Sequence, residues 1–148
     1  MKQKAIIIDL DGTLADCEHR RCFIAGTKKD WKSFSKDENI IQDKLNLWCA
    51  TIINKFKDSD KILLVTGRME SSRKITKEWL NINDIKYDLL LTRKDNDFRK
   101  DSVIKEELYK KFIEPYFDVL FCIDDRKQVV DAWRALGLVC LQCADGEF

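Results

Sequence analysis

Short apolar runs alternate along this chain with longer segments whose apolar residues recur at helical spacing. The runs predict five strands, at residues 4–10, 61–66, 87–91, 119–123 and 138–142. The longer segments predict helices at residues 41–56, 71–80, 101–112 and 127–136, and Gly137 is a natural stop for the last one. One face of the first helix would carry Ile41, Leu45, Trp48, Ile52 and Phe56.

The predicted strands are apolar throughout, which is typical of a parallel sheet that is buried on both faces. The helices between successive strands would supply that cover, so the pattern predicts a single α/β domain over residues 1–148. The segment of residues 13–36 departs from this pattern because it is polar, basic and irregular. A connection of that length is usually functional.

Polar residues gather where the predicted strands end, and the carboxyl ends of parallel strands are where such sheets bind ligands. Four groups stand at these positions: Asp9 and Asp11 after the first strand, Thr66, Gly67 and Arg68 after the second, Asp124 and Asp125 after the fourth, and Lys100 at the start of the preceding helix. Turns alone do not account for all four groups, so we expect them to form one site.

The two aspartates after the first strand suggest phosphoryl transfer. Asp9 could attack phosphorus and form an aspartyl-phosphate, while Asp11 protonates the leaving oxygen and later activates water. This division of roles predicts a higher pKa for Asp11 than for Asp9, which Mg²⁺ would keep ionised. A simple Asp-Gly turn without chemistry is the alternative interpretation of this segment.

The other groups have matching roles in this hypothesis. Asp125, with Asp124 beside it, would complete the Mg²⁺ ligands with Asp9. The Thr66 hydroxyl and the Gly67 amide could donate to phosphoryl oxygens, and Lys100 could neutralise the phosphate and Asp9. Taken alone, Lys100 would be read as a solvated surface charge.

The motifs DLDGT, LLVTGR, the lysine of FRKDSVIKEEL and IDDR, in this order, resemble the four motifs of the haloacid dehalogenase (HAD) superfamily of phosphohydrolases. The resemblance runs from residue 4 to residue 148. It implies a Rossmann-like sheet with strand order 5-4-1-2-3, dependence on Mg²⁺, and a cap insert after the first strand. Here that insert, at about residues 14–36, is short and would leave the cleft open.

From about residue 92 onward, the chain resembles the phosphatase domains of the phage polynucleotide kinase 3′-phosphatase family. The shared features are RKDSVIKEE, IDDRKQVVDAWR and a chain end of the Gly-acid-Phe type. The resemblance implies that Asp9 is the nucleophile, that Asp11 is the general acid–base and a metal ligand through its main-chain carbonyl, and that Asp124 and Asp125 serve the metal. It further implies that Thr66 and Lys100 are catalytic residues, and that Arg20, Gly67, Arg68 and Asp97 bind the substrate.

Composition bears on the partners and the location expected for this chain. The net charge of +1 gives no whole-chain attraction to nucleic acid, although a local basic surface is compatible with it. No apolar run reaches the length of a membrane helix and no secretory signal is evident, so we expect a cytoplasmic protein with reduced cysteines. Trp48, Trp79 and Trp133 should be core residues, whereas Trp31, in the divergent segment, could stack on a base.

These features favour an Mg²⁺-dependent phosphatase that acts on 3′ ends of DNA or RNA. Basic residues that could contact the phosphodiester backbone, unless they are merely a solvated face, are Arg20, Arg21, Lys28, Lys29, Arg73, Lys74, Arg93 and Lys94. A small-molecule nucleotidase and a non-catalytic module that binds nucleic-acid ends are the alternatives. No GxxxxGK[ST] motif occurs, so the 5′-kinase half is absent from this sequence, and a separate kinase or ligase is a possible partner.

Overall fold

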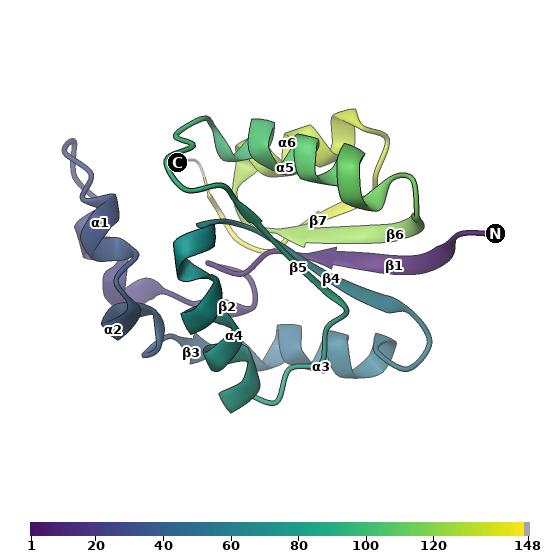
Figure 1. Ribbon diagram of the computed structural model, residues 1–148, viewed down its shortest axis with the longest axis horizontal. Helices are drawn as coiled ribbons and strands as arrows, with labels where there is room; N and C mark the ends of the chain where they lie inside the picture. The colour runs from purple at the N-terminus through teal and green to yellow at the C-terminus, as the bar shows by residue number, and fades with distance from the viewer. Residues whose placement is uncertain (147–148) are drawn as a thin grey trace.

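The computed structural model describes residues 1–146 and consists of a central parallel sheet with helices on both faces (Figure 1). The sheet order is β5-β4-β1-β6-β7, which is the predicted order 5-4-1-2-3 seen from the opposite edge. The α/β class and the strand order are therefore confirmed. Glu147 and Phe148, part of the predicted chain-end resemblance, lie outside the described residues. The strands are β1 (Gln3–Ile8), β4 (Lys61–Met69), β5 (Leu89–Arg93), β6 (Phe117–Asp124) and β7 (Cys140–Gln142).

Alternate residues of β1 point to opposite faces of the sheet, and each face has its own apolar core. Ile6 and Ile8 belong to the core beneath α3 (Leu47–Phe56) and α4 (Arg73–Ile82). Ala5 and Ile7 belong to the core on the other face. That face is covered by α5 (Asp101–Leu108) and α6 (Lys127–Ala135), so that Figure 1 shows the sheet between two helical layers.

The predicted helix at residues 41–56 is wrong in its first part. Helix α3 begins only at Leu47, while Ile41 follows a short helix and Leu45 lies in a short strand. The buried face of α3 consists of Cys49, Ala50 and Ile53. As a result, the Trp48 side chain is 44% exposed and is not a core residue, whereas Trp79 and Trp133 are buried as expected.

The segment between β1 and α3 is longer and more structured than the predicted irregular stretch of residues 14–36. It folds back on itself through an antiparallel pair in which Ala15 lies opposite Leu45. We call residues 14–45 the insert. Figure 1 places its helices beyond the carboxyl ends of the sheet strands, so it stands beside the expected site. Its elements are β2 (Ala15–Asp16), the 3₁₀ helix η1 (Glu18–Phe23), α1 (Trp31–Phe34), α2 (Asp37–Ile40) and β3 (Lys44–Leu45).

Strand β4 departs from regular pairing where it reaches the carboxyl edge. Val65 lies opposite Leu91 and Met69 opposite Arg93, so four residues of β4 span the distance covered by two residues of β5. Residues 66–68 are therefore displaced from the ladder, in the way that bulges next to sites re-aim side chains. A 3₁₀ turn, η2 (Glu70–Ser72), joins β4 to α4.

The predicted helix at residues 101–112 continues past α5 as a π-helical segment, η3 (Tyr109–Ile113). Gly137 has a positive φ of 86° directly after α6, as expected for a glycine that ends a helix. No helix within residues 1–146 is long and apolar enough to cross a membrane.

Candidate active site

Three buried carboxylates meet where β1 and β6 end side by side. Ile8 pairs with Ile123, and the Asp9 amide donates to the Ile123 carbonyl, so Asp9 lies next to Asp124. One oxygen each from Asp9, Asp124 and Asp125 lies within 4.8 Å of the others, and all three residues are buried. The structure thus brings together three of the predicted metal-binding residues.

Glycine is required where the chain turns away from Asp11. Gly12 has a φ of 82°, a left-handed conformation that L side chains rarely adopt. A Cβ atom at this position would also overlap the carboxylate of Asp125. Thr13 follows and donates a hydrogen bond to Asp9 Oδ2 over 3.3 Å, which helps to orient that carboxylate.

Lys105, rather than the predicted Lys100, is the lysine of this cluster. Its Nζ donates to Asp9 Oδ1 and to Asp124 Oδ2, each over 2.8 Å, and its side chain is 3% exposed. Lys100 is exposed and precedes the first turn of α5. The reason is helical geometry, because Ile104 and Lys105 lie on the inner face of α5 while Lys100 lies before it.

The charges in this cluster are unbalanced, and the pKa values reflect this. Burial and the neighbouring charge of Asp124 raise the pKa of Asp9 well above its ordinary value, although Lys105 partly opposes them. Burial and Asp124 also raise the pKa of Asp125. Burial disfavours the charge on Lys105, but Asp124 and Asp9 outweigh that effect and raise its pKa.

The arrangement fits a divalent cation. Three carboxylates face one ammonium, which leaves an excess of negative charge in a buried place. In addition, Asp125 Oδ2 is buried without a hydrogen-bond donor, and the nearest cation described for it is Arg21 Nη2 at 3.6 Å. Carboxylate oxygens are the ligands that Mg²⁺ prefers, so these residues suit the predicted ion.

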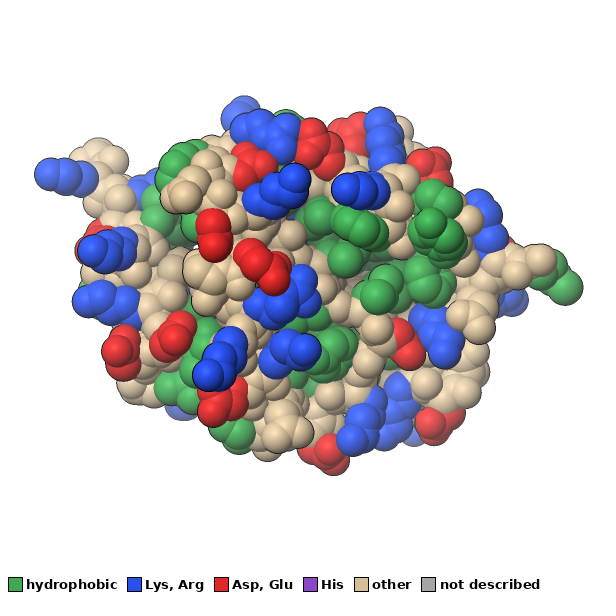
Figure 2. Space-filling view, viewed as in Figure 1, with side chains coloured by type: hydrophobic (Ala, Val, Ile, Leu, Met, Phe, Trp, Pro, Cys, Tyr) green, Lys and Arg blue, Asp and Glu red, His purple; other side chains and the backbone are tan. Residues whose placement is uncertain are grey.

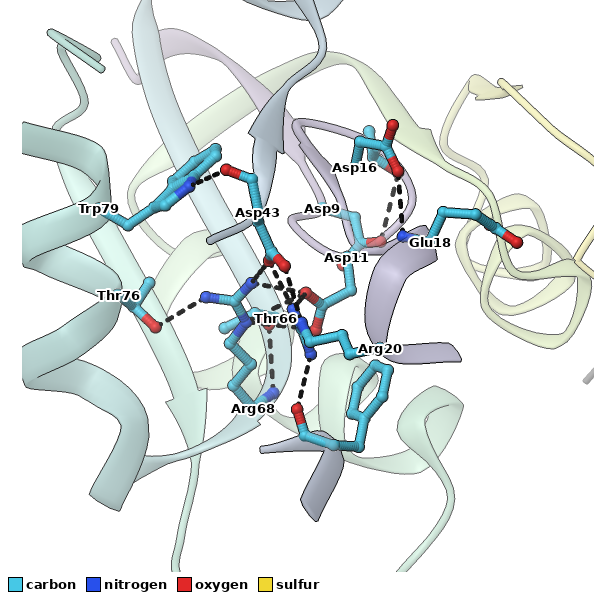
Figure 3. A network of polar contacts seen from close by, with 12 residues as sticks. Asp9, Asp11, Asp16, Glu18, Arg20, Asp43, Thr66, Arg68, Thr76 and Trp79 are labelled. Carbon is cyan, nitrogen blue, oxygen red and sulfur yellow. Dashed lines mark hydrogen bonds and ion pairs between the residues drawn. The ribbon is translucent and has the colours of Figure 1, made fainter. Parts of the chain in front are cut away.

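Asp11 faces a different set of partners from Asp9. Arg20 Nη2 lies 2.6 Å and Arg68 Nη2 2.5 Å from Asp11 Oδ1, as Figure 3 shows. Burial would raise the pKa of Asp11, but the charges of Arg68 and Arg20 outweigh it and hold this pKa well below its usual range. The predicted order of the two pKa values is therefore wrong here, because two guanidinium groups stabilise the Asp11 carboxylate. Its side chain also lies outside the three-carboxylate cluster.

Asp43 is a site residue that the sequence did not reveal. Its side chain is completely buried and accepts hydrogen bonds from Arg20 Nε and Nη2, from Arg68 Nη2 and from His19 Nε2. Its main-chain carbonyl accepts a hydrogen bond from Trp79 Nε1 over 2.8 Å (Figure 3). The apolar spacing of residues 41–56 assigned Asp43 to a helix, so no local signal marked it.

The displaced residues 66–68 of β4 lie at the site as expected, and Asp101, which was not predicted, lies beside them. Thr66 is buried, and its hydroxyl accepts a hydrogen bond from the Arg68 amide over 3.1 Å. A Cβ atom at Gly67 would overlap the carboxylate of Asp101, which forms ion pairs with Arg93 and with Arg126. Asp101 therefore lies beside the phosphate-binding segment predicted from the sequence.

Asp97, the acid predicted for this place, has a more peripheral position. Its carboxylate pairs with Arg99 over 2.8 Å, and half of the Arg99 side chain is exposed. The hydrogen bonds from Arg99 lower the pKa of Asp97 to about 2. Helical spacing relates the two residues that the structure places here instead, because Asp101 in the first turn and Lys105 in the last turn of α5 lie four residues apart on one side of the helix.

Three comparisons place this geometry among known proteins. The sequence profile of the family described as HAD_PNKP, polynucleotide kinase PNKP phosphatase domain, matches residues 3–148. A chain in the structure of a Pnkp1/Rnl/Hen1 complex is 40% identical, with a TM-score of 0.85 over 99% of this chain and 48% of its own length. A second structure, of a Pnkp1/Rnl/Hen1 RNA repair complex, gives 38% identity and a TM-score of 0.83 over 99% of this chain and 44% of that one.

More distant relatives agree with these matches. A protein of Autographa californica nuclear polyhedrosis virus, whose name proposes a bifunctional polynucleotide kinase/RNA ligase, is 28% identical over 90% of this chain and 18% of its own length. This chain thus spans less than half the length of each of these three relatives. A hydrolase from Streptococcus pneumoniae TIGR4, at 17% identity, has a TM-score of 0.63 over 98% of this chain and 95% of that one, which shows a common fold.

Lys105→Ala is expected to reduce the rate of phosphate-monoester hydrolysis about a hundredfold, because it removes the cation that offsets Asp9 and Asp124. Lys100→Ala serves as the matched control and should stay within about twofold of the unsubstituted protein. Release of inorganic phosphate measures both, with circular dichroism to verify folding. Equal losses in the two variants would contradict the assignment of Lys105.

Asp9→Asn should raise the free energy of unfolding of the metal-free protein at pH 7, whereas Asp11→Asn should lower it. The pKa of Asp9 is raised by folding, so its ionisation costs stability as the pH rises through the folded value. The pKa of Asp11 is lowered, so its stabilisation is present above the unfolded value and is lost at lower pH.

Urea unfolding in EDTA between pH 7 and pH 4 measures both effects. The gain from Asp9→Asn should shrink as the pH falls toward the unfolded pKa of about 4, whereas the loss from Asp11→Asn should persist to pH 4 and shrink only below it. Changes of the same sign at pH 7 would contradict the electrostatic difference between the two aspartates.

Asp43→Asn is expected to reduce the free energy of unfolding by about 3 kcal/mol, since it leaves Arg20 and Arg68 short of a buried counter-charge. Glu38→Gln, an exposed substitution in the same insert, is the control and should change stability by less than about 0.5 kcal/mol. Urea unfolding at neutral pH compares them, and an unaffected midpoint for Asp43→Asn would refute the role given to this carboxylate.

Proposed function

The chain belongs to the HAD phosphatase family of the polynucleotide kinase PNKP phosphatase domain, and on this premise we propose that it removes 3′-terminal phosphate from DNA or RNA. Membership of this family makes it a phosphoric monoester hydrolase. The observation that carries the proposal is the match, over nearly the whole chain, to a chain of an RNA repair complex. The assembled carboxylates, lysine and arginines supply the chemistry that such a reaction needs.

In the proposed reaction, an Asp9 carboxylate oxygen attacks the terminal phosphorus and forms an aspartyl-phosphate. The bond from phosphorus to the 3′ oxygen breaks, and this oxygen takes a proton from Asp11. Water then attacks the phosphorus while Asp11 removes a proton from it, which releases inorganic phosphate and restores Asp9. The products are a 3′-hydroxyl end and phosphate.

Asp11 needs a proton for the first step, although the structure holds it as a carboxylate between two arginines. A terminal phosphate carries up to two negative charges and would compete for Arg20 and Arg68. When these guanidinium groups turn toward the phosphate, Asp11 loses stabilisation and its pKa rises. Binding of substrate would thereby convert Asp11 into a general acid.

Other residues would position the phosphate and keep Asp9 reactive. The Thr66 hydroxyl and the Gly67 amide would donate to phosphoryl oxygens, and Lys105 would hold Asp9 through its hydrogen bond. Asp9, Asp124 and Asp125, with the main-chain carbonyl of Asp11, would bind Mg²⁺, which would offset the negative charge that develops on the phosphoryl group.

The presence of companion enzymes is a second part of the proposal. The viral relative is named as a bifunctional polynucleotide kinase/RNA ligase, and the two structural neighbours belong to Pnkp1/Rnl/Hen1 complexes, one of which is called an RNA repair complex. The 148 residues contain no GxxxxGK[ST] motif for a kinase. We therefore propose that a 5′-kinase and a ligase act beside this phosphatase, supplied by another chain or by another part of the same protein.

Phosphate release with Mg²⁺ should be fastest from a 3′-phosphorylated oligonucleotide, because the proposed substrate is a polynucleotide end. The comparison includes its 5′-phosphorylated counterpart and the 3′- and 5′-mononucleotides, with EDTA and the Asp9→Asn variant as controls. Both controls should abolish turnover. Equal or faster rates with mononucleotides would identify a nucleotidase instead, and no turnover with any substrate would indicate a non-catalytic module.

A further inference from the structure

Trp31 is an exposed aromatic side chain that is nevertheless held in place. It begins helix α1 and is 45% exposed. Its ring contacts the ring of Phe34 edge to face, with the centroids 5.6 Å apart. The Asp30 side chain accepts a hydrogen bond from the Ser33 amide, which fixes the start of the same helical turn. Trp31 therefore presents a surface to solvent without needing to reorganise before it binds something.

Phe34 connects this tryptophan directly to the active site. It is buried, and its ring lies over the guanidinium of Arg20, 4.3 Å from centroid to Cζ. Its main-chain carbonyl also accepts a hydrogen bond from Arg20 Nη1 over 3.1 Å. Since Arg20 in turn binds Asp11, only one aromatic ring separates Trp31 from an arginine of the site.

Lysines flank Trp31 along the chain, before Asp37 and Glu38 begin the next helix. Residues 24–36 contain four lysines and one aspartate, and that aspartate, Asp30, is engaged in the helix turn. The four lysines are exposed, and Lys29 Nζ lies 5.7 Å from the centroid of the Trp31 ring. Figure 2 shows Lys and Arg side chains along the edge of the molecule where α1 and the loop before it lie. Exposed aromatic rings among cations are typical of surfaces that bind single-stranded nucleic acid.

We propose that Trp31, with Lys28, Lys29 and Lys32, binds the nucleotides that precede the 3′-terminal phosphate, Trp31 by stacking on a base. This inference rests on the proposed function and specifies that the substrate is a single-stranded end. A strand whose terminal phosphate lies at Asp9 would pass Arg20 and Phe34 and reach α1 within its last few nucleotides. The lysines would contact its phosphodiesters, which makes binding sensitive to salt.

The test compares kcat/KM for a 3′-phosphorylated single-stranded oligonucleotide with kcat/KM for the matching 3′-mononucleotide. Trp31→Ala should lower this ratio about tenfold through a higher KM for the oligonucleotide, whereas Trp31→Phe should restore most of it. Tyr116→Ala is the matched control, since Tyr116 is 62% exposed and precedes the amino end of β6, whereas the site lies at the carboxyl ends of the strands. RNA and DNA oligonucleotides, and a blunt duplex end, form the substrate arms.

The contribution of Lys28 and Lys32 is measured separately, through the salt dependence of KM. In Lys28→Ala/Lys32→Ala, the slope of log KM against log salt should fall by about 1.4 for the oligonucleotide, because about 0.7 is lost per phosphate contact with a single strand. Lys55→Ala/Lys57→Ala is the control pair, at the far end of α3, and should keep the original slope.

The outcomes separate the two proposals. If the unsubstituted protein shows no preference for the oligonucleotide, the proposed function fails. If it does prefer the oligonucleotide but Trp31→Ala keeps the full ratio, or if a blunt duplex end is the better substrate, the assignment of a single-strand surface to α1 is overturned.

Discussion

The position of the insert depends on the ion pairs of one of its own residues, the buried Asp43. It accepts hydrogen bonds from Arg20 of the insert and from Arg68 at the end of β4, while its main chain receives the indole of Trp79 from α4. Two buried guanidinium groups side by side would repel each other without it. Asp43 and Asp11 together balance these two charges, so the insert, the sheet and the α4 layer meet at a neutral cluster. The same ion pairs fix the two arginines beside Asp11.

The neighbouring three-carboxylate cluster has the opposite character. Asp9, Asp124 and Asp125 are buried with a single ammonium, and burial together with the charge of Asp124 raises the pKa of Asp9 despite the opposing charge of Lys105. Buried carboxylates of this kind destabilise the folded state of the free protein, and binding of a cation would stabilise it. Within a few ångströms, therefore, the structure combines a balanced cluster that holds residues in position with an unbalanced one that favours a ligand.

The sequence predicted the sheet well because buried parallel strands have a continuous apolar pattern, as residues 4–10 and 61–66 show. It also located Asp9 and Asp125, since the ends of such strands converge. It failed for Lys105 because a charged residue on a helix is usually solvated, and only the inward direction of that helix face brings Lys105 to Asp9 and Asp124. It failed for Asp43 because the insert is organised by ion pairs between distant residues, which leave no local periodicity.

The displaced segment of β4 has a consequence for how this fold can change in length. Four residues of β4 span the same length as two residues of β5. The direction of the Arg68 side chain therefore depends on the number of residues between Val65 and Met69. Removing or adding one residue there would change the direction of the Arg68 side chain and separate it from Asp11. The exposed loop before α1 has no such restriction, as it pairs with no strand of the main sheet. Evolutionary change in chain length should therefore concentrate in the loop before α1. There it would alter the surroundings of the site without moving Arg20 or Arg68.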